Sequence, residues 1–228
     1  MLRITLGGSG FIGFPADQES GYIKLVFPQG HDKRPLLRTY TIRQQRSDSI
    51  DVDFAIHEHK GPALTWAKNA QVGDKILVSG PGPKRDINLN ADWFILCGDM
   101  TALPAISVNL ASMPDNAKGY AIIEVLDEKD IQPLSHPDGI DLIWIIGSEH
   151  KTFETETYPL LERLKQSPSL SGDLSVWVAC EFSSMKAIRQ YLKSHYTLPK
   201  THFYTSSYWK IGLDQDEHKI VKKADAER

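Results

Sequence analysis

The sequence predicts a two-domain α+β chain, in which an antiparallel β-barrel is followed by an α/β domain built on a parallel sheet. Three observations predict this fold class. Residues 1–85 contain short strand-like runs separated by Gly- and Pro-rich segments. Four continuous apolar runs follow, and helical patterns alternate with them. The length of 228 residues is compatible with two small domains.

The first part of the chain, residues 1–85, has the spacing of a small barrel. Its strand candidates alternate or are rich in β-branched residues, and one short helical stretch, residues 63–70, lies between two of them. Several short strands at this spacing indicate an antiparallel barrel or sandwich. The strand candidates are Leu2–Leu6, Tyr22–Phe27, Arg38–Arg43, Ile50–Ile56 and Lys75–Val78.

The second part, residues 86–212, has a different pattern of apolar residues. Continuous apolar runs indicate strands that are buried on both faces, as in a parallel sheet, and helices between them indicate βαβ units. The charged stretch 213–228 is expected to be a solvated helix or tail. The strand candidates are Trp93–Cys97, Tyr120–Leu126, Leu142–Ile146, Ser175–Ala179 and Thr201–Tyr208, and the helix candidates are Thr101–Met113, Thr157–Gln166 and Ser183–His195.

Composition excludes several classes of protein. The 26 basic and 29 acidic residues give a net charge of −3, whereas nucleic-acid binders usually have a basic excess. A membrane span needs about 20 apolar residues in a row, and the longest apolar run is far shorter. The two cysteines, Cys97 and Cys180, are too few for a disulfide framework or a four-thiolate zinc site. We therefore expect a soluble cytoplasmic protein with free thiols.

The segment Gly8–Gly13 matches the G-x-G-x-x-G pattern of dinucleotide-binding folds. That fingerprint requires a helix that begins at the glycines, so that its N-terminus faces a pyrophosphate. Here Pro15 follows at once and the next ordered element is a predicted strand. We therefore interpret the segment as a glycine-rich turn between two barrel strands.

The segment Arg38–Arg43 carries the strongest chemical signal in the chain. Side chains alternate along a strand, which places Arg38 and Tyr40 on one face. An aromatic ring beside guanidinium groups suits a flavin, because the ring stacks on the isoalloxazine and the charges bind phosphates. The hydroxyl of Thr41 adds a hydrogen-bonding group. The alternative is an edge strand with a solvated cationic face.

A strand end and a helix start follow this segment. Gly61 and Pro62 precede a short helix, whose first turn exposes N–H groups that bind an anion. Thr65 adds a hydroxyl, and His57 can donate a hydrogen bond to a phosphate or ribose oxygen or be simply exposed. His57 and His59 also suggest a metal site, but no further ligands have suitable spacing. We predict no metal.

These residues resemble the siderophore-interacting proteins, which are FAD-containing ferric-siderophore reductases of the ferredoxin-reductase-like superfamily. The resemblance covers nearly the whole chain, in order, across both predicted domains. It rests on RTYTIR at 38–43, DFAIH at 53–57, GPALTWA at 61–67, GDKILVSGP at 73–81, GDMTALPA at 98–105, VWVACE at 176–181 and YWKIG at 208–212.

The resemblance implies an FAD site in the barrel and an NAD(P)H site at the carboxyl ends of the second sheet. Met100, Cys180 and Lys210 depart from the family pattern in the second domain, and Leu64 departs from it in the first. The implied FAD residues are Arg38, Tyr40, Thr41, Arg43, Asp53, Phe54, Ala55, His57, Gly61, Pro62, Ala63, Leu64 and Thr65. The NAD(P) candidates are Asp99, Thr101, Cys180, Glu181 and Trp209.

The same resemblance implies a reaction and its partners. NAD(P)H or ferredoxin would reduce the FAD, and a ferric siderophore would accept one electron and release Fe(II) in the cytoplasm. Lys24, Lys33 and Lys210 are the candidates for holding an anionic siderophore, although each lysine alone is typical of a solvated surface. We expect a monomer. The other hypothesis is a siderophore-binding, iron-handling module without turnover.

Family members usually have another barrel strand before the segment that begins at Met1, so either a strand is missing or the numbering is offset.

Overall fold

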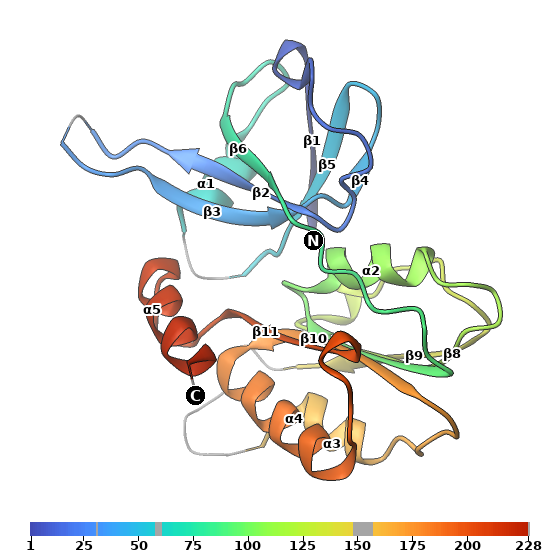
Figure 1. The fold of residues 1–228 in the computed structure, drawn as a ribbon. Coiled ribbons are helices and arrows are strands. Elements are labelled where there is room, and N and C mark those ends of the chain that lie inside the picture. The colour runs from blue at the N-terminus through green and yellow to red at the C-terminus, as the bar shows by residue number, and fades with distance from the viewer. Residues whose placement is uncertain (31, 58–60, 148–156, 228) are drawn as a thin grey trace. The chain divides into compact units, whose positions relative to one another are not determined.

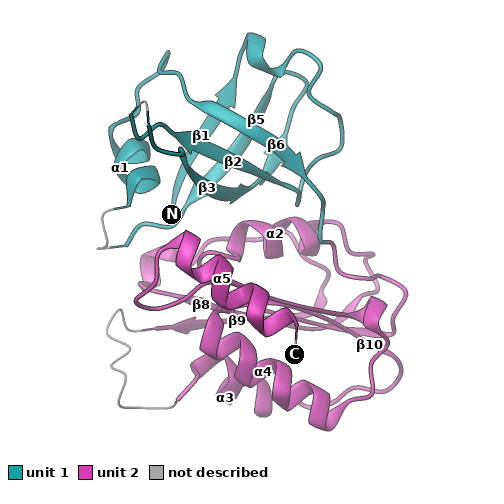
Figure 2. Ribbon diagram, turned by 60° about the vertical axis from the view of Figure 1, so that its left-hand side comes forward, with its two compact units in different colours: residues 1–85 teal, residues 86–228 magenta. Residues whose placement is uncertain are grey.

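The computed structural model describes residues 1–30, 32–57, 61–147 and 157–227 (Figure 1). The chain divides into two compact units, residues 1–85 and 86–228 (Figure 2). The predicted α+β fold class is confirmed, because antiparallel sheets form the first unit and a five-stranded parallel sheet with helices forms the second. Among the described residues, no helix combines the length and the apolar character that a bilayer span requires.

The first unit consists of two three-stranded antiparallel sheets, with strand orders β1-β5-β4 and β3-β2-β6. One α-helix follows β5. The elements are β1 (Leu2–Gly7), the 3-10 turn η1 (Ser9–Phe11), β2 (Tyr22–Phe27), β3 (Leu36–Thr41), β4 (Gln44–Gln45), β5 (Ser49–Phe54), α1 (Pro62–Asn69) and β6 (Leu77–Gly82).

The core of the first unit comes from alternate residues of its strands. Ile23 and Leu25 of β2 are fully buried, and so are Val52 and Phe54 of β5. Ala67 from α1 packs against the same cluster. Because side chains alternate along a strand, the residues between these positions face the other side of each sheet. The structure thus encloses one apolar core between the two sheets and α1.

The chain crosses from one sheet to the other directly after β3. The sequence predicts a strand over Arg38–Arg43, but β3 ends at Thr41. The Ile42 amide then donates to the Gly21 carbonyl at 2.8 Å, and the Arg43 amide donates to the Asp51 carbonyl at 2.9 Å. Arg43 therefore lies beside β5, whereas Arg38 and Tyr40 remain on β3.

Strand β6 extends further than the sequence predicts. The sequence predicts a strand over Lys75–Val78, but β6 begins at Leu77 and continues to Gly82. It lies at the edge of its sheet, where Gly and Pro are tolerated because a central ladder is not interrupted. A side chain at Gly82 would meet the ring of Tyr22, since a Cβ there would lie 2.1 Å from its Cζ atom.

The glycine-rich segment Gly8–Gly13 lies between β1 and β2. It contains only the 3-10 turn η1 and no α-helix. Gly8 and Gly13 have positive φ angles, a conformation that glycine adopts without steric cost. The interpretation as a turn therefore agrees with the structure.

The second unit contains a parallel sheet with strand order β11-β10-β7-β8-β9. Helix α2 covers one face, and α3 and α4 cover the other (Figure 1). The elements are β7 (Trp93–Asp99), α2 (Leu103–Ala111), β8 (Lys118–Val125), η2 (Glu128–Asp130), β9 (Gly139–Ile146), α3 (Pro159–Lys165), β10 (Leu174–Glu181), α4 (Phe182–His195), η3 (Lys200–His202), β11 (Phe203–Trp209) and α5 (Gln215–Ala226).

The charged C-terminal stretch forms helix α5, which packs on the second unit along one face. Asp214 caps the helix in a capping box with Glu217. His218 is buried, and one of its ring nitrogens is 2.8 Å from the Ser207 hydroxyl of β11. The sequence predicts a solvated helix or tail here, but burial of His218 makes the helix part of the second unit.

Candidate functional site

Three aromatic rings form a continuous group that extends from the core of the first unit to its partly exposed residues. The ring centroids of Tyr40 and Phe54 are 4.4 Å apart, and those of Phe54 and Trp66 are 6.1 Å apart. The group therefore joins β3, β5 and α1. Burial raises the pKa of Tyr40 to about 12, although the charge of Arg38 opposes this shift. The phenol consequently stays protonated at neutral pH, so Tyr40 offers a flat, uncharged ring.

The start of α1 leaves backbone N–H groups without an intrahelical acceptor. Gly61 is the N-cap and contributes no side-chain cap, and Pro62 occupies the first helical position. The Thr65 amide closes the first intrahelical bond on the Gly61 carbonyl at 2.9 Å. Pro62 has no N–H, so the amides of Ala63 and Leu64 are the first-turn donors that lack an intrahelical acceptor. Such amides bind phosphate groups.

A shallow hollow of about 470 Å³ lies along the same side of α1. A Cβ atom built on Gly61 would meet nothing within 4 Å, so the approach to the helix start is open among the described residues. Thr65 is exposed. The lining residues are Gly61, Pro62, Thr65, Trp66, Asn69, Ala70 and Asp74. The hollow runs from the first turn of α1 past its last turn, and Trp66 of the aromatic group lines it.

The two predicted arginines of the flavin segment have different surroundings. Arg38 donates from Nη1 to the Leu37 carbonyl at 3.0 Å and is half-buried on β3 beside Tyr40. Arg43 lies past the end of the strand, where its Nε atom is 4.0 Å from Asp53 Oδ2. Burial lowers the pKa of Arg43, with a further contribution from Arg3. Arg38 is thus on the same strand as Tyr40 and Thr41, whereas Arg43 interacts with β5.

The side chain of Asp53 is engaged in an ion pair. Arg3 Nε and Nη2 donate to its two carboxylate oxygens at 2.7 and 2.8 Å. Asp53 and Phe54 are successive residues of β5, so Asp53 faces away from the aromatic group. Sequence reasoning missed Arg3, although the alternation of Arg3 and Thr5 opposite Asp51 and Asp53 was a possible signal. The structure therefore ties Asp53 to the sheet.

The residues after β5 leave the sheet. Ala55 is half-buried, and His57 is exposed and has an interaction partner. His59, the second histidine of the alternative metal site, lies outside the described residues. Within the described ranges, no group of three or more His, Cys, Asp or Glu side chains is placed to hold a metal ion.

In the second unit, Asp99 brings most of the predicted nucleotide-site residues together. Its Oδ1 atom accepts hydrogen bonds from the amide and hydroxyl of Thr101 at 2.9 and 2.5 Å. Its Oδ2 atom accepts from the Glu181 amide at 2.9 Å and from the Trp209 indole at 2.8 Å. Asp99 is itself buried. Four of the five candidates thus form one hydrogen-bonded network at the carboxyl ends of β7, β10 and β11.

Cys180, the fifth candidate, does not join this network through its side chain. It is fully buried and packs with Cys97 in the core beneath α3 and α4. Burial raises the pKa of both thiols. Met100, another departure from the family pattern, is also buried, and its sulfur accepts a hydrogen bond from the Leu126 amide at 3.3 Å. Both substitutions therefore place apolar side chains in the interior of the second unit.

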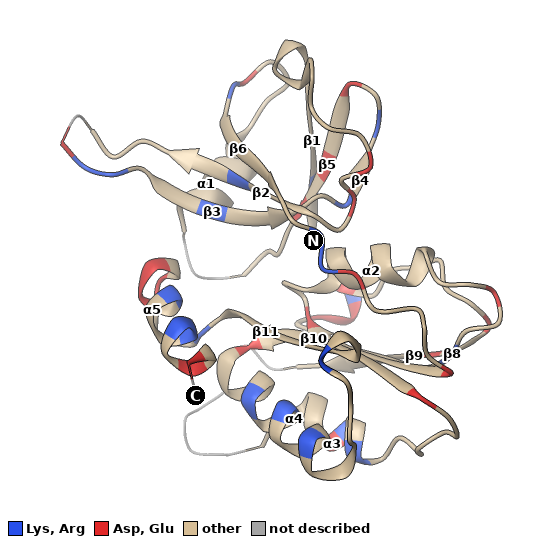
Figure 3. Cartoon of the chain, viewed as in Figure 1, with Lys and Arg blue, Asp and Glu red and all other residues tan. Residues whose placement is uncertain are grey.

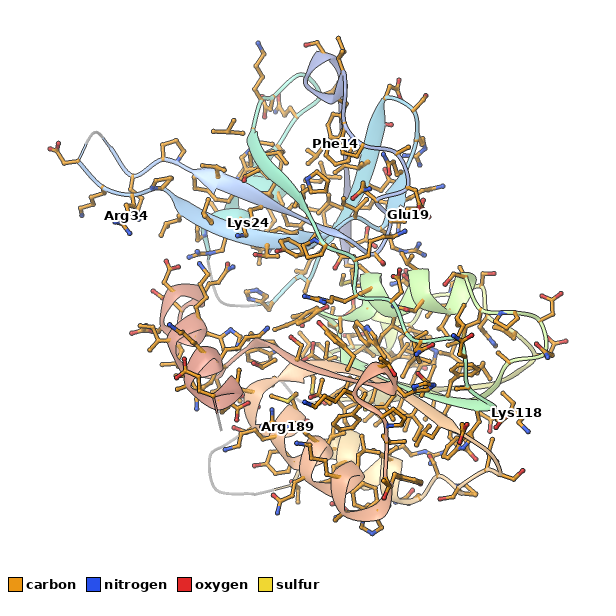
Figure 4. All side chains as sticks on the ribbon, in the orientation of Figure 1. Phe14, Glu19, Lys24, Arg34, Lys118 and Arg189 are labelled. Carbon is orange, nitrogen blue, oxygen red and sulfur yellow. The ribbon has the colours of Figure 1, made fainter. Side chains whose placement is uncertain are left out.

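The three predicted substrate lysines lie in different places. Lys24 is on β2 (Figure 4), with its Nζ atom 6.0 Å from the centroid of the Tyr22 ring. Lys33 is exposed in the connection between β2 and β3. Lys210 follows β11 in the second unit, with its Nζ atom 4.5 Å from the centroid of the Phe182 ring. Figure 3 shows further basic residues along α4, a helix that contains no acidic residue.

Comparison with known proteins shows two matching families and several similar chains. Residues 91–212 match the siderophore-interacting protein family, and residues 29–85 match the siderophore-interacting FAD-binding domain. The chain is 35% identical to the ferric vibriobactin reductase ViuB of Vibrio cholerae over 240 residues, which covers 96% of this chain and 87% of ViuB.

Two solved structures complete the comparison. The siderophore-interacting protein SipS from Aeromonas hydrophila is similar over 99% of this chain and 92% of its own, with a TM-score of 0.86 and 31% identity. Ferredoxin-NADP+ reductase from Plasmodium falciparum, at 15% identity and a TM-score of 0.60, covers 90% of this chain and 88% of its own. That likeness shows a shared ferredoxin-reductase-like fold.

Proposed function

Because the chain belongs to the siderophore-interacting protein family, we propose that it is an FAD-dependent reductase that delivers electrons to the Fe(III) of a ferric siderophore. The observation that carries the proposal is the aromatic group of Tyr40, Phe54 and Trp66 beside the open start of α1. Both features lie in the part of the chain that matches the FAD-binding domain. FAD fits this pairing, because its isoalloxazine can stack on a flat ring and its phosphates can accept hydrogen bonds from backbone N–H groups.

When bound, FAD supplies the redox chemistry, and the protein's part is to bind and orient it. In the proposed site, Tyr40 would hold the isoalloxazine ring by stacking, and Thr41 would donate a hydrogen bond to the flavin. Arg38 and the amides of Ala63 and Leu64 would bind the phosphates. Arg43, Asp53, Phe54, Ala55 and His57 support or line the site, as do Gly61, Pro62 and Thr65.

The proposed electron donor is NAD(P)H, which would bind at the carboxyl ends of β7 and β10 near Asp99, Thr101 and Glu181. Open α/β sheets bind their ligands at this edge. A reduced ferredoxin is the alternative donor. Two buried free cysteines support a cytoplasmic location, where thiols remain reduced.

The proposed substrate is a ferric siderophore, and Lys24, Lys33 and Lys210 are the candidates for binding its negative charge. Each Fe(III) takes one electron and becomes Fe(II), which the siderophore holds weakly and releases. Because the whole chain has a net charge of −3, attraction for an anionic chelate depends on such local cations.

The first experiment tests the reaction without a nucleotide. FAD-loaded protein is reduced with dithionite under anaerobic conditions, freed of excess reductant and mixed with a ferric catecholate or a ferric hydroxamate. We expect the flavin absorbance at about 450 nm to return and about two Fe(II) per flavin to be trapped by a chromogenic chelator. Tight binding of the chelate without Fe(II) release would favour the siderophore-binding module instead.

A second experiment tests the FAD site. The double variant Arg38→Ala/Tyr40→Ala should fold but lose bound FAD, because it removes both the stacking ring and a phosphate cation. Arg34→Ala is the matched control, since Arg34 is an exposed arginine in the connection before β3 (Figure 4). Retention of FAD by the double variant at the level of the control would contradict the assignment.

A further inference from the structure

The strand order of the second unit marks where a ligand binds. The chain forms β7 in the middle of the sheet, continues outward through β8 and β9, and then returns to form β10 and β11 on the other side of β7. The direction of winding therefore reverses between β7 and β10. In open parallel sheets the ligand crevice lies outside the carboxyl ends of the strands at this switch point.

The side chain of Trp209 crosses this switch point. Trp209 is the last residue of β11 and pairs with Glu181 of β10, whereas Asp99 is the last residue of β7 on the far side of β10. Neighbouring strands are about 4.8 Å apart, so a hydrogen bond from the indole to Asp99 must span the end of β10. That bond is present, with Nε1 2.8 Å from Oδ2.

The segment around Trp209 is held at two further points. The Ile211 amide is 3.4 Å from Oε1 of Glu181, to which it donates. The ammonium group of Lys210 lies over the ring of Phe182. Gly212 then has a φ of 77°, and a Cβ there would meet nothing within 4 Å. The segment thus lies across the strand ends but leads into an open glycine, a residue that readily changes its backbone conformation.

Asp99, whose carboxylate accepts the hydrogen bond from the Trp209 indole, is also held in place. The other oxygen of Asp99 accepts two hydrogen bonds from Thr101, and Oδ2 also accepts from the Glu181 amide. A carboxylate held in this way cannot follow the indole if it moves. Hydrogen bonds to charged groups are the stronger kind, so the closed position is favoured over one in which Trp209 has swung away.

We propose that Trp209 controls the entry of a pyridine nucleotide to the crevice between β7 and β10, and that its hydrogen bond to Asp99 holds the crevice closed. This inference rests on the proposed function, because it concerns the electron donor of the same reaction. A nucleotide binds only to the fraction of molecules in which the indole has moved. Its apparent affinity is reduced by that fraction, which makes Trp209 a determinant of donor choice.

Two variants separate the effect of the hydrogen bond to Asp99 from the effect of the aromatic ring. Trp209→Phe keeps an aromatic side chain but lacks the N–H, and Trp209→Ala removes both. The matched control is Trp144→Phe, because Trp144 is also half-buried but lies on β9, at the opposite edge of the sheet. Binding of NAD+ and NADP+ to the FAD-loaded proteins is measured by isothermal titration calorimetry. These oxidised nucleotides bind without turnover.

We expect both Trp209 variants to bind at least one of the two nucleotides about tenfold more tightly than the unmodified protein, as loss of a charged hydrogen bond implies. The control should bind as the unmodified protein does. Unchanged or weaker binding by Trp209→Phe would overturn the proposal. Oxidation of dithionite-reduced flavin by the ferric chelate does not use this crevice. Measured on the unmodified protein and on Trp144→Phe, that reaction reports separately on the proposed function.

Discussion

Phe54 connects the two halves of the proposed FAD site, so replacing it should weaken FAD binding without unfolding the unit. The residue is 1% exposed, and its ring packs near those of Tyr40 of β3 and Trp66 of α1. Phe54→Leu keeps an apolar side chain but has three fewer carbons, so lost burial and a small cavity together cost about 1–3 kcal/mol in stability. It removes the aromatic pair with Tyr40, which contributes about 0.5–1.5 kcal/mol.

The expected loss of affinity follows from that contribution. If the pair orients the ring of Tyr40 for stacking, its whole free energy appears in FAD binding, and each 1.4 kcal/mol corresponds to about tenfold. The dissociation constant of FAD should therefore rise about two- to tenfold. Apoprotein is titrated with FAD, and flavin fluorescence quenching gives the dissociation constant, with circular dichroism confirming the fold.

The matched control for this experiment is Phe94→Leu. Phe94 is also a buried phenylalanine, 2% exposed, but it lies on β7 in the second unit. It should lose similar stability and leave FAD binding unchanged. An unchanged dissociation constant in Phe54→Leu, or an equal rise in Phe94→Leu, would refute the idea that Phe54 positions Tyr40.

Two further predictions concern the second unit. Cys97 and Cys180 are buried with raised pKa values, so neither should react with Ellman's reagent until denaturant exposes both; a thiol that reacts at the rate of free cysteine in native protein would contradict this. Burial, with help from Lys222 and Lys210, lowers the pKa of His218 below its usual 6.5. The unfolded chain therefore binds a proton more readily, and stability decreases as pH falls below about 6.5. His218→Gln should reduce the change in melting temperature between about pH 7.5 and about pH 5.5, and an equal change in both proteins would argue against this role.

The order and type of the elements could be predicted because their signals are local. The run Trp93–Cys97 is continuous and apolar, and it lies inside the fully buried strand β7. The helix predicted over Ser183–His195 differs from α4 by one residue. A strand that is buried on both faces is continuously apolar, and a helix that is buried on one face repeats apolar residues every three or four positions. Both patterns can be read from the sequence without knowing which strands are neighbours.

The contacts that build the sites could not be predicted in the same way. Arg3 and Asp53 are 50 residues apart, and Asp99 and Trp209 are 110 apart. Their pairing depends on the register of neighbouring strands and on the order of strands in the sheet, which periodicity does not encode. The packed face of α5 was missed for a related reason, since a single buried residue, His218, anchors an otherwise polar helix.

The paired charges of β1 and β5 also restrict how the first unit can fold. Arg3 lies opposite Asp53 and Thr5 opposite Asp51, and each pair is joined by a side-chain hydrogen bond. A slip of one residue would turn the apolar face of β1 outward. A slip of two residues would keep that face inward but place Thr5 or Met1 opposite Asp53 in place of its partner Arg3. Buried aspartates are costly without a partner. Apolar burial alone would allow β1 to shift by two residues, whereas electrostatics favours a single register.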